Sequence, residues 1–83
     1  MKVCNYEGRR NISGTRIRME RLKRRYSQQT LAAKVQLEGV LLEQDAISRI
    51  ENGTRMVQDF ELRALASVFG VTADWLMEEE MQK

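Results

Sequence analysis

Residues 44–52 carry the side chains with the clearest potential for chemistry. At about 100° per residue along a helix, Ala46, Ile47 and Ile50 share one side. The opposite side collects amides, a carboxylate, a hydroxyl and a guanidinium, from Gln44, Asp45, Ser48, Arg49 and Asn52. Such groups hydrogen-bond to base edges in the major groove of DNA: guanidinium to guanine, amide to adenine, carboxylate to the cytosine amino group. The segment therefore predicts a helix that can read bases.

An ordinary solvent-facing helix is the alternative for the same residues. Asp45 and Arg49 are four residues apart, and such a pair forms a surface ion pair worth about 0.2–0.5 kcal/mol. Any surface helix also turns polar residues outward. The spacing by itself leaves both interpretations open.

Charge is distributed unevenly along the chain. Residues 1–34 hold ten Lys or Arg and two Glu, whereas residues 35–83 hold four Lys or Arg and ten Asp or Glu. The formal net charge is only +2. This asymmetry favours contact between the N-terminal half and a polyanion, although a solvated basic helix face would give the same pattern.

Composition excludes several classes of function. The chain has no histidine and one cysteine, Cys4, so we expect no metal site, no cofactor, and no histidine-based catalysis. The carboxylates show no paired arrangement, and no small-molecule site is evident; we therefore expect that the protein is not an enzyme. No window reaches the roughly 18 apolar residues of a membrane span, and the N-terminus lacks an apolar leader, which predicts a cytoplasmic protein without membrane contact.

The elements that must position these residues are all helical. Eighty-three residues suit one domain, and the apolar spacing predicts five helices. The first spans 14–25 with Met19 and Leu22 inward, the second spans 28–37 after a Ser27 cap, and the third spans about 43–52 and ends at Gly53. The fourth follows an Asp59 cap and closes at Gly70, and the fifth follows Thr72 and contains Trp75, which we interpret as a packing residue.

The segment between the second and third helices is apolar. We expect Val40 and Leu42 to pack beneath the third helix, and the alternative is a loop that binds a partner. The acidic end of the chain is either a solvated tail or a self-association surface.

Three blocks in order carry a family resemblance: SQQTLAAKV, AISRIENGTR and DFELRALASVFGVTADWL. From about Asn11 to Met77 the chain resembles the phage-repressor and Cro-like (Xre) helix-turn-helix family. The resemblance implies a compact five-helix lambda-repressor-like DNA-binding domain, in which the second helix braces the third in the major groove. Here QLEGVLLE makes the turn between helices two and three longer than in most members. The resulting boundaries are a flexible N-terminal arm (1–12), the helix-turn-helix domain (13–77) and an acidic C-terminal tail (78–83).

The resemblance also implies roles for individual residues. Gln44, Asp45 and Arg49 match base-reading positions, and Ser48 shares their face. Gln28 matches the glutamine that meets a phosphate at a helix start, while Asn52, Thr54 and Arg55 match a loop that clamps the next phosphates. Arg16 and Arg18 have no counterpart in the motif, and we expect phosphate contacts from them on charge alone.

Three hypotheses about function follow. The first is a transcriptional regulator, namely a repressor that binds double-stranded operator DNA as a homodimer. The second is a protein-interaction module with the same fold, such as an antitoxin or assembly factor. The third is a carboxylate enzyme, for which the sequence offers no pocket.

Overall fold

The computed structural model describes residues 7–78, which fold into five helices. The helices are α1 (Gly14–Lys23), α2 (Gln28–Leu37), α3 (Gln44–Asn52), α4 (Asp59–Phe69) and α5 (Ala73–Met77). Within residues 7–78 no segment forms a strand. The predicted all-α architecture of five helices is confirmed.

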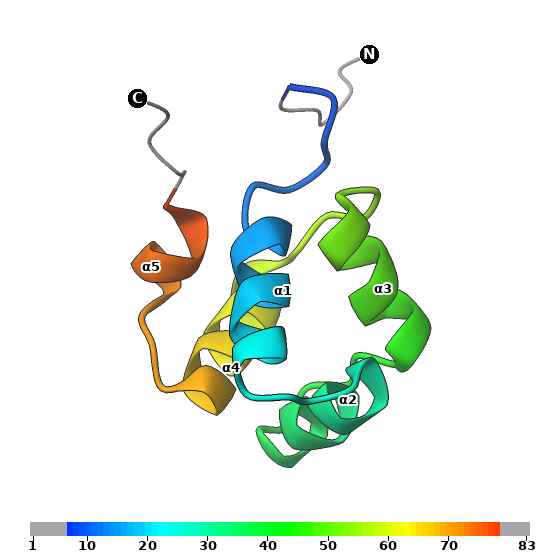
Figure 1. Cartoon of the computed structure of the whole chain (residues 1–83), viewed down its shortest axis with the longest axis vertical. Coiled ribbons are helices and arrows are strands. Elements are labelled where there is room, and N and C mark those ends of the chain that lie inside the picture. The colour runs from blue at the N-terminus through cyan, green and yellow to red at the C-terminus, as the bar shows by residue number, and fades with distance from the viewer. Residues whose placement is uncertain (1–6, 79–83) are drawn as a thin grey trace.

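The helices surround one apolar core. Figure 1 shows α1 in the middle, with α3 on one side of it and α5 on the other. α1 packs against α3, α4 and α5, and α2 closes one end of the molecule against α3 and α4. All five helices and the α2–α3 connector contribute to the core, which includes Ile17, Leu31, Val35, Leu42, Ile47, Ile50, Leu65, Phe69 and Leu76.

Most helix ends follow from local sequence. The hydroxyls of Ser27 and Thr72 each accept a hydrogen bond from the backbone N–H three residues on, at 2.9 and 3.0 Å. Gly53 and Gly70 end α3 and α4 with φ of +83° and +71°, a left-handed conformation that glycine adopts without steric cost. These four predicted ends are confirmed.

Two helix ends differ from the prediction. α4 is capped by Gln58, whose backbone N–H donates to the Glu61 carboxylate at 3.0 Å, so Asp59 is the first helical residue and not the cap. α1 ends at Lys23, two residues early, because the chain turns there and Arg25 adopts a φ of +60°.

The predicted apolar stripe of Met19, Leu22 and Tyr26 is wrong at Met19 and Leu22, whereas Tyr26 packs against the core. Met19 and Leu22 are 40% and 50% exposed, and Ile17 is the apolar residue that α1 buries completely. Beside Ile17, the charged residues Glu20 and Arg21 are also buried. The prediction from apolar spacing fails on this face because Glu20 and Arg21 each have a partner from another part of the fold, as described below.

The connector between α2 and α3 divides its apolar residues between core and solvent. Leu42 is buried and Val40 is partly covered, as predicted. In contrast, Leu37 at the end of α2 and Leu41 in the connector are 87% and 67% exposed. The connector thus holds the start of α3 against the core and leaves two leucines at the surface.

The segment before α1 is part of the packed unit. The sequence predicts an arm over residues 1–12, of which 1–6 lie outside the described residues. The Arg10 backbone N–H donates to the Gly53 carbonyl at 2.8 Å, and the Asn11 side chain is buried. Arg10 and Asn11, which belong to the predicted arm, are therefore bonded to the end of α3. Of the acidic tail, only Glu78 is described; residues 79–83 are not.

Candidate nucleic-acid interface

α3 presents one polar face and buries the other. Ile47 and Ile50 lie in the core. Gln44, Asp45, Arg49 and Asn52 are exposed, and Ser48 is partly covered. The helix begins after Glu43, whose backbone is extended, and ends where Gly53 turns the chain. The sequence-derived base-reading residues therefore lie together on one exposed surface of a single short helix.

Asp45 and Arg49 contact each other on this face. One carboxylate oxygen of Asp45 accepts hydrogen bonds from Arg49 Nε at 3.1 Å and from Nη2 at 2.8 Å. Both side chains remain more than half exposed. Since a guanidinium carries five N–H donors, this contact leaves the Nη1 and Nη2 end of Arg49 for an external acceptor. The second carboxylate oxygen of Asp45 also remains available.

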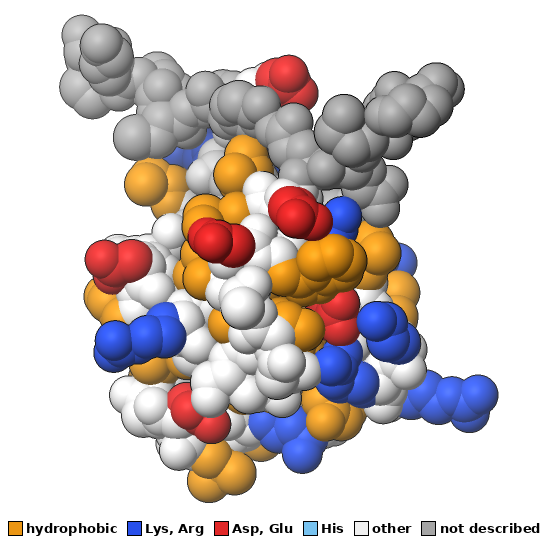
Figure 2. Space-filling model, turned by 90° about the vertical axis from the view of Figure 1, so that its left-hand side faces the viewer, with side chains coloured by type: hydrophobic (Ala, Val, Ile, Leu, Met, Phe, Trp, Pro, Cys, Tyr) orange, Lys and Arg blue, Asp and Glu red, His pale blue; other side chains and the backbone are white. Residues whose placement is uncertain are grey.

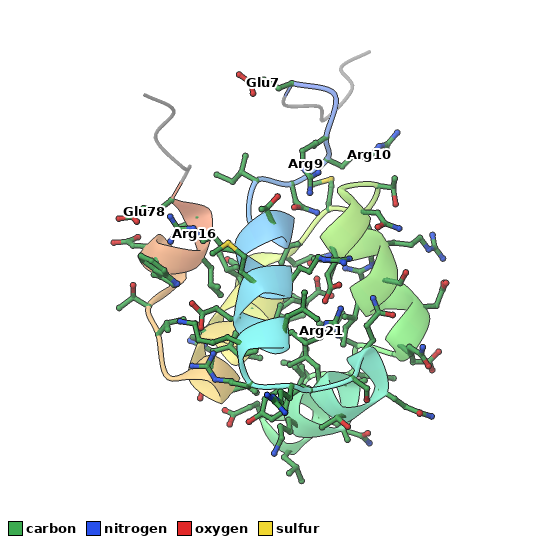
Figure 3. The ribbon with its side chains drawn as sticks, in the orientation of Figure 1. Glu7, Arg9, Arg10, Arg16, Arg21 and Glu78 are labelled. Atoms are coloured by element: carbon green, nitrogen blue, oxygen red, sulfur yellow. The ribbon has the colours of Figure 1, made fainter. Side chains whose placement is uncertain are left out.

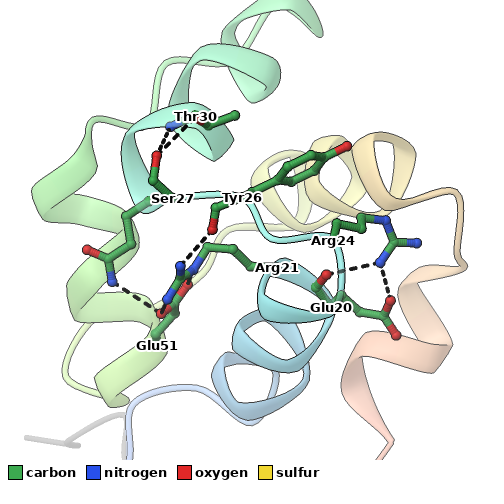
Figure 4. A network of polar contacts seen from close by, with 8 residues as sticks. Glu20, Arg21, Arg24, Tyr26, Ser27, Thr30 and Glu51 are labelled. Atoms are coloured by element: carbon green, nitrogen blue, oxygen red, sulfur yellow. Dashed lines mark hydrogen bonds and ion pairs between the residues drawn. The ribbon is translucent and has the colours of Figure 1, made fainter.

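A buried ion pair sets the rotation of α3 about its own axis. Glu51, on the inner side of α3, accepts hydrogen bonds from Arg21 Nε at 2.6 Å and Nη2 at 2.9 Å (Figure 4). Arg21 also donates to the carbonyl of Tyr26, just before α2. Removing one partner of a buried pair typically costs about 3–5 kcal/mol, so rotating α3 out of this register is strongly unfavourable. The pair thereby holds the polar face outward.

Gln28 joins this network from the start of α2. Its Nε2 donates to Glu51 at 3.2 Å, and the side chain is partly buried. Ser27 caps the same helix end, where the helix dipole and free N–H groups favour an anion. The amide is thus held at a helix end suited to a phosphate, and its second N–H remains for an external acceptor.

The loop after α3 exposes two of the predicted phosphate residues. Asn52 and Thr54 are both exposed on either side of Gly53. The Thr54 backbone N–H donates to the Arg49 carbonyl at 2.9 Å, which ties the loop to the last turn of α3. Their side chains are therefore held near the C-terminal end of the polar face.

Arg55 is directed to another partner. Its guanidinium donates to the two Glu61 carboxylate oxygens at 2.9 and 3.2 Å and to the Met56 carbonyl at 2.9 Å. Burial alone would raise the pKa of Glu61, but hydrogen bonds from Arg55 and the Gln58 backbone hold it below its ordinary value. Arg55 therefore joins the loop after α3 to α4.

Arg16 and Arg18 lie in different surroundings. Arg16 is nine-tenths buried, and its guanidinium stacks 3.8 Å from the centre of the Trp75 ring, with Glu78 nearby at 3.7 Å (Figure 3). It faces α5 and is enclosed there, so we leave it out of the candidate interface. Arg18 is exposed on α1. Trp75 packs as predicted and donates its indole N–H to Glu20 at 2.8 Å.

Comparison with known families decides the assignment. The sequence model of a family described as helix-turn-helix matches residues 17–76, which cover all five helices except the start of α1 and the end of α5. The chain belongs to this family, as a helix-turn-helix DNA-binding domain of the Cro-like, Xre type. No curated protein matches the chain.

The helix-turn-helix assignment gives the elements their names. α2 and α3 are the two helices of the motif, and residues 38–43 form its lengthened turn. The family consists of DNA-binding regulators of transcription and is not an enzyme family. Among the described helices, none is both long enough and apolar enough to cross a membrane.

Sequence reasoning missed the residues that hold the helix-turn-helix motif in place. Glu51 and Arg21 fall on inward helix positions, four residues after Ile47 and Ile17 respectively. That spacing was a usable signal, because a charge on a core-facing position must find an opposite charge. Asn11, which is buried and bonds to the end of α3, had no such signal.

Proposed function

We propose that this helix-turn-helix protein binds specific operator sequences in double-stranded DNA as a homodimer and represses transcription by occluding a promoter. One observation carries the proposal: the outward face of α3 is polar over its whole length, while a buried ion pair fixes its direction. A helix so held can enter the major groove without ordering itself first, which lowers the entropic cost of binding.

The exposed groups have chemically distinct tasks in this proposal. Arg49 reads guanine with the end of its guanidinium, Gln44 reads adenine, and Asp45 both orients Arg49 and offers its second oxygen to a cytosine amino group. Ser48 completes the reading face. The phosphate contacts come from Gln28 at the start of α2, and from a group of exposed residues: Arg18, Asn52 and Thr54.

The size of the protein supports the proposal of dimeric binding. Half-sites read from one side of the duplex are about 34 Å apart, one turn of DNA. The molecule extends 34 × 34 × 19 Å, so two copies on successive turns would lie next to each other. Two half-sites also multiply the sequence discrimination of a single reading helix. The protein would act in the cytoplasm, on the DNA there.

Selection of bound duplexes from a random DNA pool tests the proposal. We expect a two-fold symmetric sequence with half-sites about one helical turn apart, and two protein copies for each duplex in sedimentation. Recovery of no preferred sequence, or of a site bound by a single copy, would contradict specific dimeric binding.

Variants of Arg49 and Gln28 test the division of tasks. Arg49→Ala should lose about 1–3 kcal/mol of discrimination at one base pair, because the guanine contact is removed. Gln28→Ala should weaken all duplexes by a similar factor, because a phosphate contact carries no sequence information. Anisotropy titrations with single-base variants of the selected site measure both. Equal, sequence-independent losses for the two variants would refute the assignment.

A protein-interaction role is the second candidate, and the exposed leucines favour it. Leu37 and Leu41 lie at 87% and 67% exposure in and beside the lengthened turn, where a partner could cover them. This function predicts that the chain binds a partner protein with an affinity that does not depend on salt, and that it has little affinity for DNA. The same titrations against DNA therefore distinguish the two functions.

A further inference from the structure

The segment before α1 is bound to the end of α3. The Arg10 backbone N–H donates to the Gly53 carbonyl at 2.8 Å. Next to it, the Asn11 side-chain nitrogen donates to the carbonyls of Ile50 at 3.0 Å and Arg55 at 2.7 Å. These three hydrogen bonds fix the backbone of Arg10 beside the loop that follows the reading helix.

The Arg9 guanidinium contacts other residues of the protein. Its guanidinium lies over Gly53, so closely that a Cβ on this glycine would sit 2.5 Å from the Arg9 Cζ. Its Nη2 also donates to the Glu51 carbonyl at 3.4 Å. The carbonyl end of a helix carries partial negative charge, which would repel a phosphate. Arg9 offsets that charge at the end of α3.

Arg10 points the other way. Figure 3 shows its side chain extending outward on the α3 side of the molecule, whereas that of Arg9 turns inward. Arg10 is exposed, and within residues 7–78 its guanidinium forms no hydrogen bond or ion pair. The backbone of Arg10 is thus fixed beside Gly53, which the exposed residues Asn52 and Thr54 flank, while the Arg10 guanidinium is unused.

We propose that Arg10 is a further phosphate-contacting residue, which binds the DNA backbone beside the C-terminal end of α3. This inference rests on the DNA binding proposed above and adds a contact from outside the five helices. A phosphodiester suits the site because the planar guanidinium can donate two parallel hydrogen bonds to phosphate oxygens. The bonded backbone means that little order has to be gained on binding.

Salt-dependent titration of Arg10 variants tests this contact. The probes are the duplex that the wild-type protein selects from the random pool and an unrelated duplex of equal length. Arg10→Gln should weaken both by the same factor, roughly three- to tenfold at low salt, and should flatten the slope of log K against log salt by about 0.9. Arg10→Lys keeps the charge and should keep most of the slope.

Lys23→Gln is the matched control. Lys23 is an exposed cation at the end of α1, and its nearest carboxylate is Glu20, which bonds to Trp75 on the α5 side. Lys23→Gln removes one positive charge, as Arg10→Gln does, and should leave the slope of log K against log salt unchanged. If Arg10→Gln and Lys23→Gln behave alike while the wild type binds its selected site tightly, the Arg10 contact is refuted and the proposed function stands. If the wild type binds neither duplex, both proposals fail.

Discussion

At the scale of single residues, buried charge explains more of this protein than apolar spacing does. Each of three buried carboxylates meets an arginine: Glu20 meets Arg24, Glu51 meets Arg21, and Glu61 meets Arg55. A buried carboxylate without such a partner would be strongly destabilising. The arginines of the basic N-terminal half therefore serve partly as internal counter-charges, and only some remain for DNA.

The exposed pair on α3 gives a prediction at this scale. Asp45→Ala should free Arg49 from its orienting contact and broaden the preference at the base pair that we propose Arg49 reads, while folding stability changes by only about 0.2–0.5 kcal/mol. Titrations with single-base variants of the selected duplex measure the preference. Asp74→Ala, which removes an exposed carboxylate from α5, is the control.

Asp45→Ala also removes a negative charge, and the effect of that charge on DNA affinity must be separated from the effect of orienting Arg49. Losing a carboxylate near DNA raises the affinity for every sequence because a repulsion disappears. A uniform rise with unchanged base preference would show that Asp45 acts only through its charge. A change of preference at one base pair supports the orienting role.

At the scale of elements, α3 is held at three places along its length. Leu42 anchors the connector before it, the Glu51–Arg21 pair fixes its inner side, and the Arg9–Asn11 segment bonds to its end. None of these contacts uses the exposed polar residues. These contacts therefore hold α3 in place and leave its exposed polar side chains available.

The approach of α1 to α3 gives a prediction for this arrangement. Gly14 lies so near the end of α3 that a Cβ there would be 2.1 Å from the Ile50 carbonyl oxygen. Gly14→Ala should therefore force the two helices apart and destabilise the fold by about 1–3 kcal/mol or more. Thermal unfolding measures the loss, with Thr15→Ala, at an exposed neighbouring position, as the control. Equal stability of the two variants would rule out this close contact.

At the scale of the whole molecule, charges of both signs lie on the side that carries α5. Figure 2 shows the α5 side, where acidic, basic and apolar side chains intermingle. Such a mixed surface produces no single-sign field that would attract a duplex. Together with the net charge of +2, this favours binding through local, well-placed cations over attraction of the whole molecule.

The buried carboxylates make the stability of the whole molecule depend on acid pH. Burial alone would raise the pKa of Glu20, but hydrogen bonds from Arg24 and Trp75 hold it below its ordinary value of 4.5, and the pKa of Glu61 is lowered similarly. A depressed folded-state pKa stabilises the fold above the unfolded-state value, and this contribution is lost as pH falls through the folded-state value. The free energy of unfolding should therefore decrease as the pH is lowered below about 4.5.

Urea unfolding at pH 7 and pH 3 measures this effect. Glu61→Gln should be less stable than the wild type at pH 7 and should lose less stability on going to pH 3, because the titrating group is gone. With no histidine in the chain, little change is expected between pH 6 and pH 7.5. An equal loss in wild type and variant would show that Glu61 does not contribute.

The sequence by itself determined the elements and the composition of the polar face of α3. Ser27, Gly53 and Gly70 set helix ends through contacts with residues a few positions away, and the alternation around α3 follows from helical geometry alone. Such local rules need no knowledge of the fold. The two errors arose where these rules were not enough. At Asp59, the neighbouring Gln58 caps the helix through Glu61. On α1, charged residues are buried because distant residues pair with them.

Only the tertiary structure decided which arginines remain free. Arg16, Arg21 and Arg10 all belong to the basic N-terminal part of the sequence, yet one stacks on Trp75, one bonds Glu51, and one faces solvent. The partners of Arg16 and Arg21 lie tens of residues away, and only the packing of α1 against α3 and α5 brings them within reach. Burial then makes each pairing obligatory, because an unpaired charge cannot be held away from water.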